Sequence, residues 1–471
     1  GSWRGFDAAL PFALTDDQVT AGETIAQELA TERPMNRLVQ GEVGSGKTLV
    51  ALRAMLQVAQ SGGQSALLAP TEVLAQQHLR SITRALGPDL AATMRPVLFT
   101  GQLGAAERKK ASLAIASGSA SIVIGTHALL GDRVLFADLG LVVVDEQHRF
   151  GVEQRDTLRA KGLLPPHLLV LTATPIPRTV AMTVFGDLDV TTIAQLPAGR
   201  QPIESFVVPL AEKPGWGGRI WSRIAEELAQ GRQAFVVCPA IDASGDPEEA
   251  DDELPPDEML DESAPKRPIA SVSETFERLA VMPALTGARI RGLHGRMSAE
   301  EKDETMRAFA AGEIDVLVST TVIEVGVDVP NASVMAVLDA ERFGVSQLHQ
   351  LRGRVGRGGV PGIALFVTSA PEGSLARERV DAVAATTDGF ELAERDLQMR
   401  HEGDVLGATQ SGRRSSLRLL SAATDGELIA QAREDAIEIV AVDPGLLTHP
   451  ALAAAIARRL DATSEAFLTR A

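Results

Sequence analysis

Two series of apolar runs follow one another along this 471-residue chain, separated by stretches with apolar residues at helical spacing. Several runs are continuously apolar rather than alternating, which is typical of parallel strands covered on both faces. The first series predicts strands at Arg37–Gln40, Ser65–Ala69, Val97–Thr100, Ser121–Gly125, Leu141–Asp145 and Leu168–Thr172. The second predicts strands at Ile203–Val208, Ala234–Cys238, Arg289–Leu293, Asp315–Ser319, Val334–Leu338 and Ile363–Val367. Strands that alternate with helices predict two α/β lobes, each a doubly wound parallel sheet.

Breaks in this pattern suggest four regions. Residues 1–14 are expected to be a tag remnant, Gly1-Ser2, and a linker from a missing upstream domain. Residues 15–199 form the first lobe, whose first helix Thr15 is expected to cap, and a Pro/Gly-rich linker near residues 195–202 ends it. Residues 200–370 form the second lobe, and residues 371–471 form a C-terminal helical region.

Composition is typical of a globular protein, with 45% apolar and 23% charged residues. The net charge of −17 is unevenly distributed, because residues 242–267 hold eleven acidic and two basic residues and account for −9 of it. This Pro-rich segment is expected to be a disordered insertion in the second lobe. The net charge therefore does not exclude a nucleic-acid partner. The single cysteine, Cys238, lies in an apolar run and is expected to be a buried, inert thiol, which suits a cytoplasmic location.

The strongest chemical motif is Gly41-Glu42-Val43-Gly44-Ser45-Gly46-Lys47-Thr48, which has the spacing of a phosphate-binding loop between a strand and a helix. Glycines allow successive backbone N–H groups and the helix N-terminus to face a polyphosphate. A lysine at this position reaches the β- and γ-phosphates, and the hydroxyl of the following threonine holds Mg²⁺. The sequence therefore predicts ATP and Mg²⁺ as ligands. The predicted nucleotide-binding residues here are Gly41, Gly44, Ser45, Gly46, Lys47 and Thr48.

Acidic and hydroxyl residues follow two later strands of the same lobe. Asp145 and Glu146 come directly after four apolar residues, so Asp145 is expected to hold Mg²⁺ and Glu146 to activate the attacking water. Thr172 and Thr174 follow the next strand and are expected to couple the γ-phosphate to movement. A plain turn at the strand end is the simpler alternative for these threonines.

The second lobe has no phosphate loop and carries clustered arginines instead. Arg352, Arg354 and Arg357 lie among glycines, in a segment unsuited to a helix or a core. Arg354 and Arg357 are therefore expected to act as arginine fingers toward a triphosphate held by the first lobe. A solvated basic turn is the alternative. Asp328 is a candidate for binding the ribose hydroxyls.

In this order the motifs resemble the superfamily-two helicases and translocases, whose motors consist of two RecA-like lobes. The segments Asp145–Gly151 and Thr172–Thr179 resemble specifically the RecG family of branched-DNA translocases. The resemblance implies a role for Gln18 and Gly326 in ATP binding and for His148 and Gln350 in coupling. It also implies DNA contacts from loops at strand ends, at Pro70, Thr71, Thr100, Gly101, Thr126, His294 and Thr320.

Residues 388–412 resemble the translocation motif of this family, a helical hairpin and loop that converts lobe movement into motion along duplex DNA. The resemblance implies a coupling role for Arg400 and Gln410. The chain departs from the family pattern at His401-Glu402, where Gly-Pro is usual. Without the resemblance, this stretch predicts only an amphipathic helix that ends in a glycine-rich loop.

The resemblance implies an ATP-dependent DNA helicase or translocase that remodels forks and Holliday junctions in DNA repair and recombination. It further implies a monomer in the cytoplasm, associated with the nucleoid, with double-stranded and branched DNA and a single-stranded-DNA-binding protein as partners. The wedge domain by which the family recognises forks has no counterpart in these residues, so the chain is expected to be the motor fragment. The absence of tyrosine and the 4% aromatic content suit a duplex tracker better than a single-strand binder.

Three alternatives remain open at this stage. The first is a transcription-repair coupling translocase, which usually has Glu-Gln where this chain has Gln147-His148. The second is a protein-translocating ATPase built on the same lobes, which DNA-stimulated hydrolysis would exclude. The third is a non-catalytic binding module, which the complete set of Lys47, Asp145, Glu146 and Arg354 disfavours.

Overall fold

The computed structural model describes residues 6–7, 10, 13–131, 134–145, 161–162, 164–177, 188–195, 203–242, 269–321, 329–399 and 425–459. The chain divides into two compact units. The first comprises Gly1–Pro177 and Asp187–Met399 and contains two sheets; the second comprises Arg178–Gly186 and Arg400–Ala471. We call residues 13–177 and 187–195 lobe 1 and residues 203–399 lobe 2.

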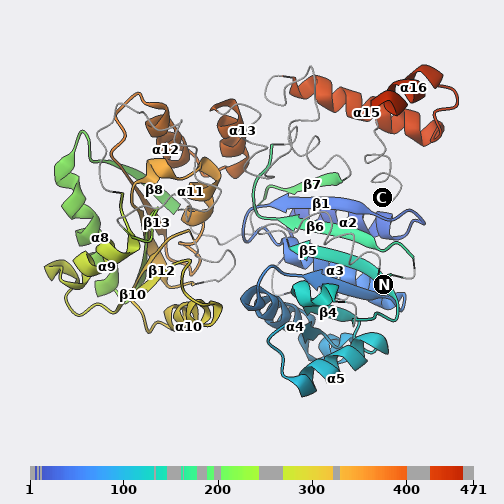
Figure 1. The fold of residues 1–471 in the computed structure, drawn as a ribbon, viewed down its shortest axis with the longest axis horizontal. Helices are drawn as coiled ribbons and strands as arrows, with labels where there is room; N and C mark the ends of the chain where they lie inside the picture. Colours follow the sequence, from blue (N-terminus) through green and yellow to red (C-terminus); the bar gives the residue numbers. More distant parts are fainter. Residues whose placement is uncertain are drawn as a thin grey trace. The chain divides into compact units, whose positions relative to one another are not determined.

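Lobe 1 is built on a seven-stranded parallel sheet with the strand order β3-β4-β2-β5-β6-β1-β7 (Figure 1). Its strands are β1 (Asn36–Gly41), β2 (Gln64–Leu68), β3 (Val97–Phe99), β4 (Ile122–Gly125), β5 (Leu139–Asp145), β6 (His167–Thr172) and β7 (Asp189–Ile193). Its helices are α2 (Asp16–Leu29), α3 (Lys47–Gln60), α4 (Glu72–Met94), α5 (Ala105–Ala116) and the 3-10 turn η1 (His127–Leu130). Figure 1 shows α4 and α5 near β4, at one end of the sheet; α4 contacts β3 and β4, and α5 contacts β3.

Lobe 2 contains a six-stranded parallel sheet with the strand order β10-β11-β9-β12-β13-β8. Its strands are β8 (Ile203–Pro209), β9 (Gln233–Val237), β10 (Ile290–Leu293), β11 (Val316–Ser319), β12 (Ala332–Val337) and β13 (Gly362–Thr368). Its α-helices are α8 (Gly217–Ala229), α9 (Val272–Ala280), α10 (Ala299–Ala310), α11 (Val345–Arg352), α12 (Leu375–Ala385) and α13 (Gly389–Met399). Three 3-10 turns connect them, η2 (Pro214–Trp216), η5 (Pro283–Leu285) and η6 (Ala340–Arg342). The second unit contributes α15 (Gly426–Val442) and α16 (Pro450–Arg459).

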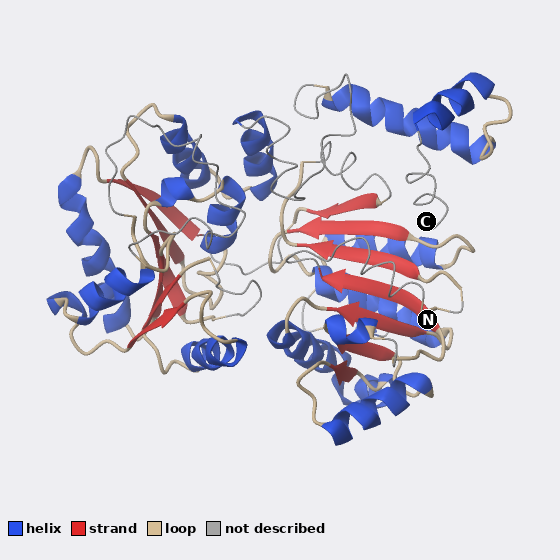
Figure 2. Ribbon diagram, in the orientation of Figure 1, coloured by secondary structure: helices blue, strands red, loops and turns tan. Residues whose placement is uncertain are grey.

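The predicted fold class is confirmed: both sheets are parallel and helices flank the strands of each (Figure 2). Continuous apolar strands form the cores, as in β5, where Leu141–Val144 are fully buried. Such strands are covered on both faces, which is the condition under which parallel sheets are stable. Cys238 is also buried as expected, and burial raises the pKa of its thiol to about 12.

Strand β7 is absent from the sequence prediction. Its five residues, Asp-Val-Thr-Thr-Ile, alternate in character and lie at the edge of the sheet, where one side of the strand has no strand partner. The acidic insertion from residue 243 onward and the linker at residues 196–202 lie outside the described residues. Within the described residues, no helix combines the length and the apolarity needed to cross a membrane.

Candidate nucleotide and nucleic-acid site

The phosphate loop follows β1 and leads into α3, as its spacing predicts. Gly44 and Gly46 have φ values of +84° and +86°, a left-handed conformation that only glycine adopts at little cost. A Cβ at Gly46 would lie 2.2 Å from Nε2 of Gln18, so that no larger residue fits there without displacing that side chain. These glycines turn the loop into the start of α3, where an anion is favoured.

Lys47 is held inside this loop by the loop's own carbonyl groups. Its Nζ donates to the carbonyl oxygens of Gly41 at 2.6 Å and Glu42 at 2.8 Å. Burial is the largest influence on its ammonium group and lowers the pKa to about 8, although Asp145 and Glu42 act in the opposite direction. The positive charge of Arg357 also lowers this pKa, which means that Arg357 lies near enough to act electrostatically on Lys47.

Gln18 and Ser45 complete the loop. Gln18 is buried, and its side chain closes a capping box with Thr15 at the start of α2 while its Nε2 donates to the Ser45 carbonyl at 2.8 Å. The Ser45 hydroxyl is buried and has no hydrogen-bond partner among the described residues. A buried hydroxyl without a partner is costly, so this loop fits a ligand that brings hydrogen-bond acceptors, as phosphate does.

Asp145 ends β5 and is 5% exposed. Its Oδ2 lies 2.6 Å from Nε2 of His78, which comes from α4. His78 is not among the site residues expected from the sequence. Only the strand order could have indicated this residue. Strand β2 leads into α4 and pairs directly with β5. A side chain from the first turns of α4 can therefore reach the end of β5.

Carboxylate and hydroxyl oxygens are the donors that Mg²⁺ prefers, so Asp145 and Thr48 suit that ion by their chemistry. Among the described residues, no group of three or more His, Cys, Asp or Glu side chains could hold a metal ion. In sites that hold a nucleotide, oxygens of the bound phosphate usually complete the coordination of Mg²⁺.

Helix α11 brings predicted residues of lobe 2 to lobe 1. Gln350 donates from Nε2 to the Thr174 hydroxyl at 2.8 Å, and the Thr174 N–H donates to the Thr172 hydroxyl at 3.2 Å. Three residues predicted to couple nucleotide to movement thus form one chain of contacts. The expectation that the arginine segment suits neither a helix nor a core is wrong for Arg352, which ends α11 and is 1% exposed, and for Arg354, which is 3% exposed. Arg357 donates to the Gly353 carbonyl at 2.9 Å.

The residues predicted to contact nucleic acid lie at or just beyond strand ends. Three of them carry a buried side-chain atom that has no hydrogen-bond partner among the described residues. These atoms are Oγ1 of Thr126, Oγ1 of Thr320 and Nδ1 of His294. Thr71 instead caps α4, where its hydroxyl accepts from Leu74 N–H at 3.3 Å. Pro70 precedes this cap, the Thr100 side chain is buried, and the Gly101 carbonyl accepts from the Arg108 guanidinium.

Several predicted site residues lie outside the described residues, and their roles stay predictions. These are Glu146, His148, Gly326, Asp328, Arg400 and Gln410, together with His401-Glu402.

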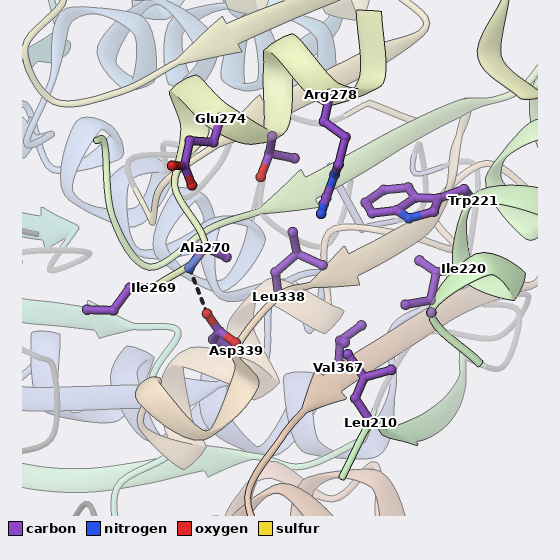
Figure 3. A pocket seen from close by; sticks show the side chains of 12 residues that line it. Leu210, Ile220, Trp221, Ile269, Ala270, Glu274, Arg278, Leu338, Asp339 and Val367 are labelled. Atoms are coloured by element: carbon purple, nitrogen blue, oxygen red, sulfur yellow. Dashed lines mark hydrogen bonds between the residues drawn. The ribbon is translucent and has the colours of Figure 1, made fainter. Parts of the chain in front are cut away.

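Lobe 2 also contains a hollow of about 480 Å³, lined in part by Trp221, Glu274, Arg278 and Asp339 (Figure 3). Figure 3 shows Arg278 beside the Trp221 ring, and its guanidinium lies 5.2 Å from the ring centroid. No residue of the phosphate loop lines this hollow.

Two parallel-sheet lobes, with a phosphate loop in lobe 1 and arginines in lobe 2, are the arrangement that the resemblance to superfamily-two helicases implies. Three family profiles match consecutive parts of the chain: the DEAD/DEAH box helicase domain at residues 15–183, the helicase conserved C-terminal domain at 253–359, and the C-terminal part of domain 3 of ATP-dependent DNA helicase RecG at 386–465. Along nearly its whole length the chain is therefore similar to the RecG family.

Individual relatives agree with this assignment. The ATP-dependent DNA helicase RecG of Mycobacterium tuberculosis is 54% identical over 459 residues, covering 95% of this chain, and the one of Mycobacterium leprae is 52% identical over 463 residues, covering 96% of this chain. A solved structure of RecG bound to a three-way DNA junction is 36% identical, with a TM-score of 0.71 over 91% of this chain and 52% of its own. The chain spans about 60% of the length of these curated relatives.

Proposed function

We propose that this chain is the ATP-driven motor of a RecG-type translocase, which moves along double-stranded DNA and remodels branched DNA such as forks and Holliday junctions. The phosphate loop carries this proposal, because Lys47, the Ser45 hydroxyl and the left-handed glycines form a site suited to a triphosphate. The solved RecG relative bound to a three-way DNA junction supports branched DNA as the substrate.

In this proposal the residues divide the work of phosphoryl transfer. The Lys47 ammonium leaves the Gly41 and Glu42 carbonyls and binds the β- and γ-phosphates. Glu146 orients the attacking water and takes its proton, and Arg354 and Arg357 stabilise the charge of the transferring group. A magnesium ion held by Thr48 and Asp145 would neutralise phosphate charge.

DNA would be held through its backbone by loops at the strand ends of both lobes. The unpartnered polar atoms of Thr126, Thr320 and His294 support this assignment, since phosphate oxygens would satisfy them. Contacts to phosphate carry no sequence information and weaken with salt. Gln350, Thr174 and Thr172 would connect nucleotide state to lobe movement. The motor would act as a monomer and would bind a single-stranded-DNA-binding protein only as an auxiliary partner.

Steady-state ATP hydrolysis tests this proposal, measured without DNA, with linear duplex and with a three-way junction, at two salt concentrations. We expect both DNAs to stimulate hydrolysis, salt to weaken the stimulation, and Glu146→Gln to abolish hydrolysis. Hydrolysis that responds to neither DNA would contradict the proposal for this chain. A strong preference for the junction would show that fork recognition lies within these residues.

A further inference from the structure

Glu42, the second residue of the phosphate loop, contacts two segments of lobe 2. Its carboxylate oxygen Oε1 accepts from Nε2 of His349 at 3.1 Å and from the backbone N–H of Gly389 at 3.0 Å. His349 belongs to α11, and Gly389 is the first residue of α13. The backbone carbonyl of the same glutamate accepts from Lys47 at 2.8 Å. One residue therefore joins the phosphate-binding lysine to the start of α13.

The orientation of His349 is set by Arg352. A guanidinium only donates hydrogen bonds, and Nη2 of Arg352 lies 2.5 Å from Nδ1 of His349, so Nδ1 is the acceptor. The proton of the neutral ring is then on Nε2, which donates to Glu42. Arg352 is itself fixed, because it is 1% exposed and its Nη1 donates to the carbonyl of Val383 in α12 and to that of Thr386, which caps the end of α12.

Packing around Gly389 leaves no room for a side chain. A Cβ there would lie 2.6 Å from Nε2 of His349, 2.7 Å from Cγ of Pro175 and 2.9 Å from Oε1 of Glu42. Real Cβ atoms do not approach other atoms so closely, so a larger residue at Gly389 would displace these side chains. The phosphate loop, the segment after β6 and α11 thus meet at one point of α13.

We propose that Glu42 is a positioning residue that transmits nucleotide occupancy of the phosphate loop to the start of α13. The inference rests on the proposed binding of a triphosphate by this loop. When a phosphate takes the Lys47 ammonium, the Gly41 and Glu42 carbonyls lose their donor and the loop backbone changes its contacts. The Glu42 carboxylate, on the same residue, then shifts relative to His349 and Gly389. A ligand moves a distant element only through such a difference in contacts between two states.

Amide hydrogen exchange of peptides that cover residues 386–392 tests this inference on the 471-residue chain, with and without a saturating non-hydrolysable ATP analogue. In the unmodified chain we expect the analogue to change the exchange rate at Gly389 by about fivefold or more, since its N–H is bonded to Glu42. In Glu42→Ala this response is lost. In Glu42→Gln most of it returns, because the amide oxygen still accepts from the Gly389 N–H and the His349 Nε2–H.

A second pair of variants leaves Glu42 intact. Gly389→Ala displaces the start of α13 and is expected to abolish the response, whereas Gly218→Ala, where a Cβ meets no atom within 4 Å, is expected to preserve it. Urea unfolding of each variant verifies that it is folded. An analogue that fails to bind the unmodified chain overturns the proposed function. An analogue that binds without changing exchange at Gly389, or that still changes it in Glu42→Ala, overturns this inference alone.

Discussion

The two lobes share one strand order and differ in the loops that follow the strands. The order β3-β4-β2-β5-β6-β1 in lobe 1 matches β10-β11-β9-β12-β13-β8 in lobe 2, position by position along the chain. By this match β8 is the counterpart of β1, β9 of β2, and β12 of β5. Lobe 1 has one additional edge strand, β7.

The shared framework extends to individual side chains. Gln64 begins β2, and its Nε2 donates to the carbonyls of Ile115 and Ala120, at and beyond the end of α5. Gln233 begins β9, and its Nε2 donates to the carbonyls of Phe309 and Ile314, at and beyond the end of α10. In each lobe a buried glutamine thus joins a central strand to the connection that returns to the sheet.

The difference lies at the end of the first strand. In lobe 1, β1 leads into the glycine-rich loop that holds Lys47. In lobe 2, β8 ends at Pro209 and a short 3-10 turn leads into α8. The hollow of Figure 3 lies at this same topological position, between residues after β8 and β12 and helices α8 and α9. Apolar side chains line it together with Glu274, Arg278 and Asp339. The parallel sheet therefore supplies the place for a nucleotide site, and the loop supplies its chemistry.

The largest expected change in ATP hydrolysis distinguishes the loop after β1 from the loop after β8. Lys47→Ala removes the cation that reaches the phosphates, and ATP hydrolysis is expected to fall more than about 100-fold. Lys213→Ala is the matched control, because this lysine lies in the loop after β8, where its Nζ lies 4.1 Å from the Trp216 ring centroid. Steady-state hydrolysis should be unchanged in the control. Equal losses in both variants would mean that lobe 2 also binds phosphate.

The sequence alone predicts most of the strands of both lobes and the phosphate loop that distinguishes lobe 1 from lobe 2. Apolar runs locate twelve of the strands, and the glycine spacing locates the phosphate loop, because these signals are local. The pairings of His78 with Asp145 and of Glu42 with His349 and Gly389 could not be predicted in this way. They join residues from 67 to 347 positions apart, and only the strand order and the packing of lobe 2 bring these residues together.

The next effect concerns the carboxylate at the end of β5. His78→Ala removes the hydrogen-bond partner of Asp145, and outer partners of metal ligands commonly contribute between tenfold and a hundredfold to metal affinity or activity. We expect the Mg²⁺ concentration that half-saturates hydrolysis to rise by about tenfold or more. Asp339, just beyond β12, accepts instead from the Ala270 N–H at 2.7 Å. Asp339→Asn should leave the Mg²⁺ dependence unchanged, and a shift as large as that of His78→Ala would refute the assignment.

A smaller effect follows from the lowered pKa of Lys47, about 8 in this loop. Burial disfavours the charged form, and only that form attracts phosphate, so affinity for an ATP analogue should fall as pH rises through 8. At pH 9 roughly one site in ten is protonated, which predicts about tenfold weaker binding than at pH 7. Isothermal titration calorimetry across this range measures the slope. Lys47→Met should bind weakly with no such slope, and a flat profile in the unmodified chain would contradict the prediction.

The smallest effect on ATP hydrolysis is expected from the buried glutamines that both lobes share. Gln64→Ala and Gln233→Ala each remove the donor to two carbonyls next to a central strand, and each should destabilise its own lobe by about 1–3 kcal/mol. Hydrogen exchange of β2 and β9 in urea measures the two costs separately, since each strand reports on its own lobe. Ser117→Ala, an exposed hydroxyl at the end of α5, is the control and should cost less than about 0.5 kcal/mol. Similar costs in the two lobes, with hydrolysis retained, would separate the common framework from the chemistry of the loops. A loss of stability in only one lobe would show that Gln64 and Gln233 do not stabilise their lobes in the same way.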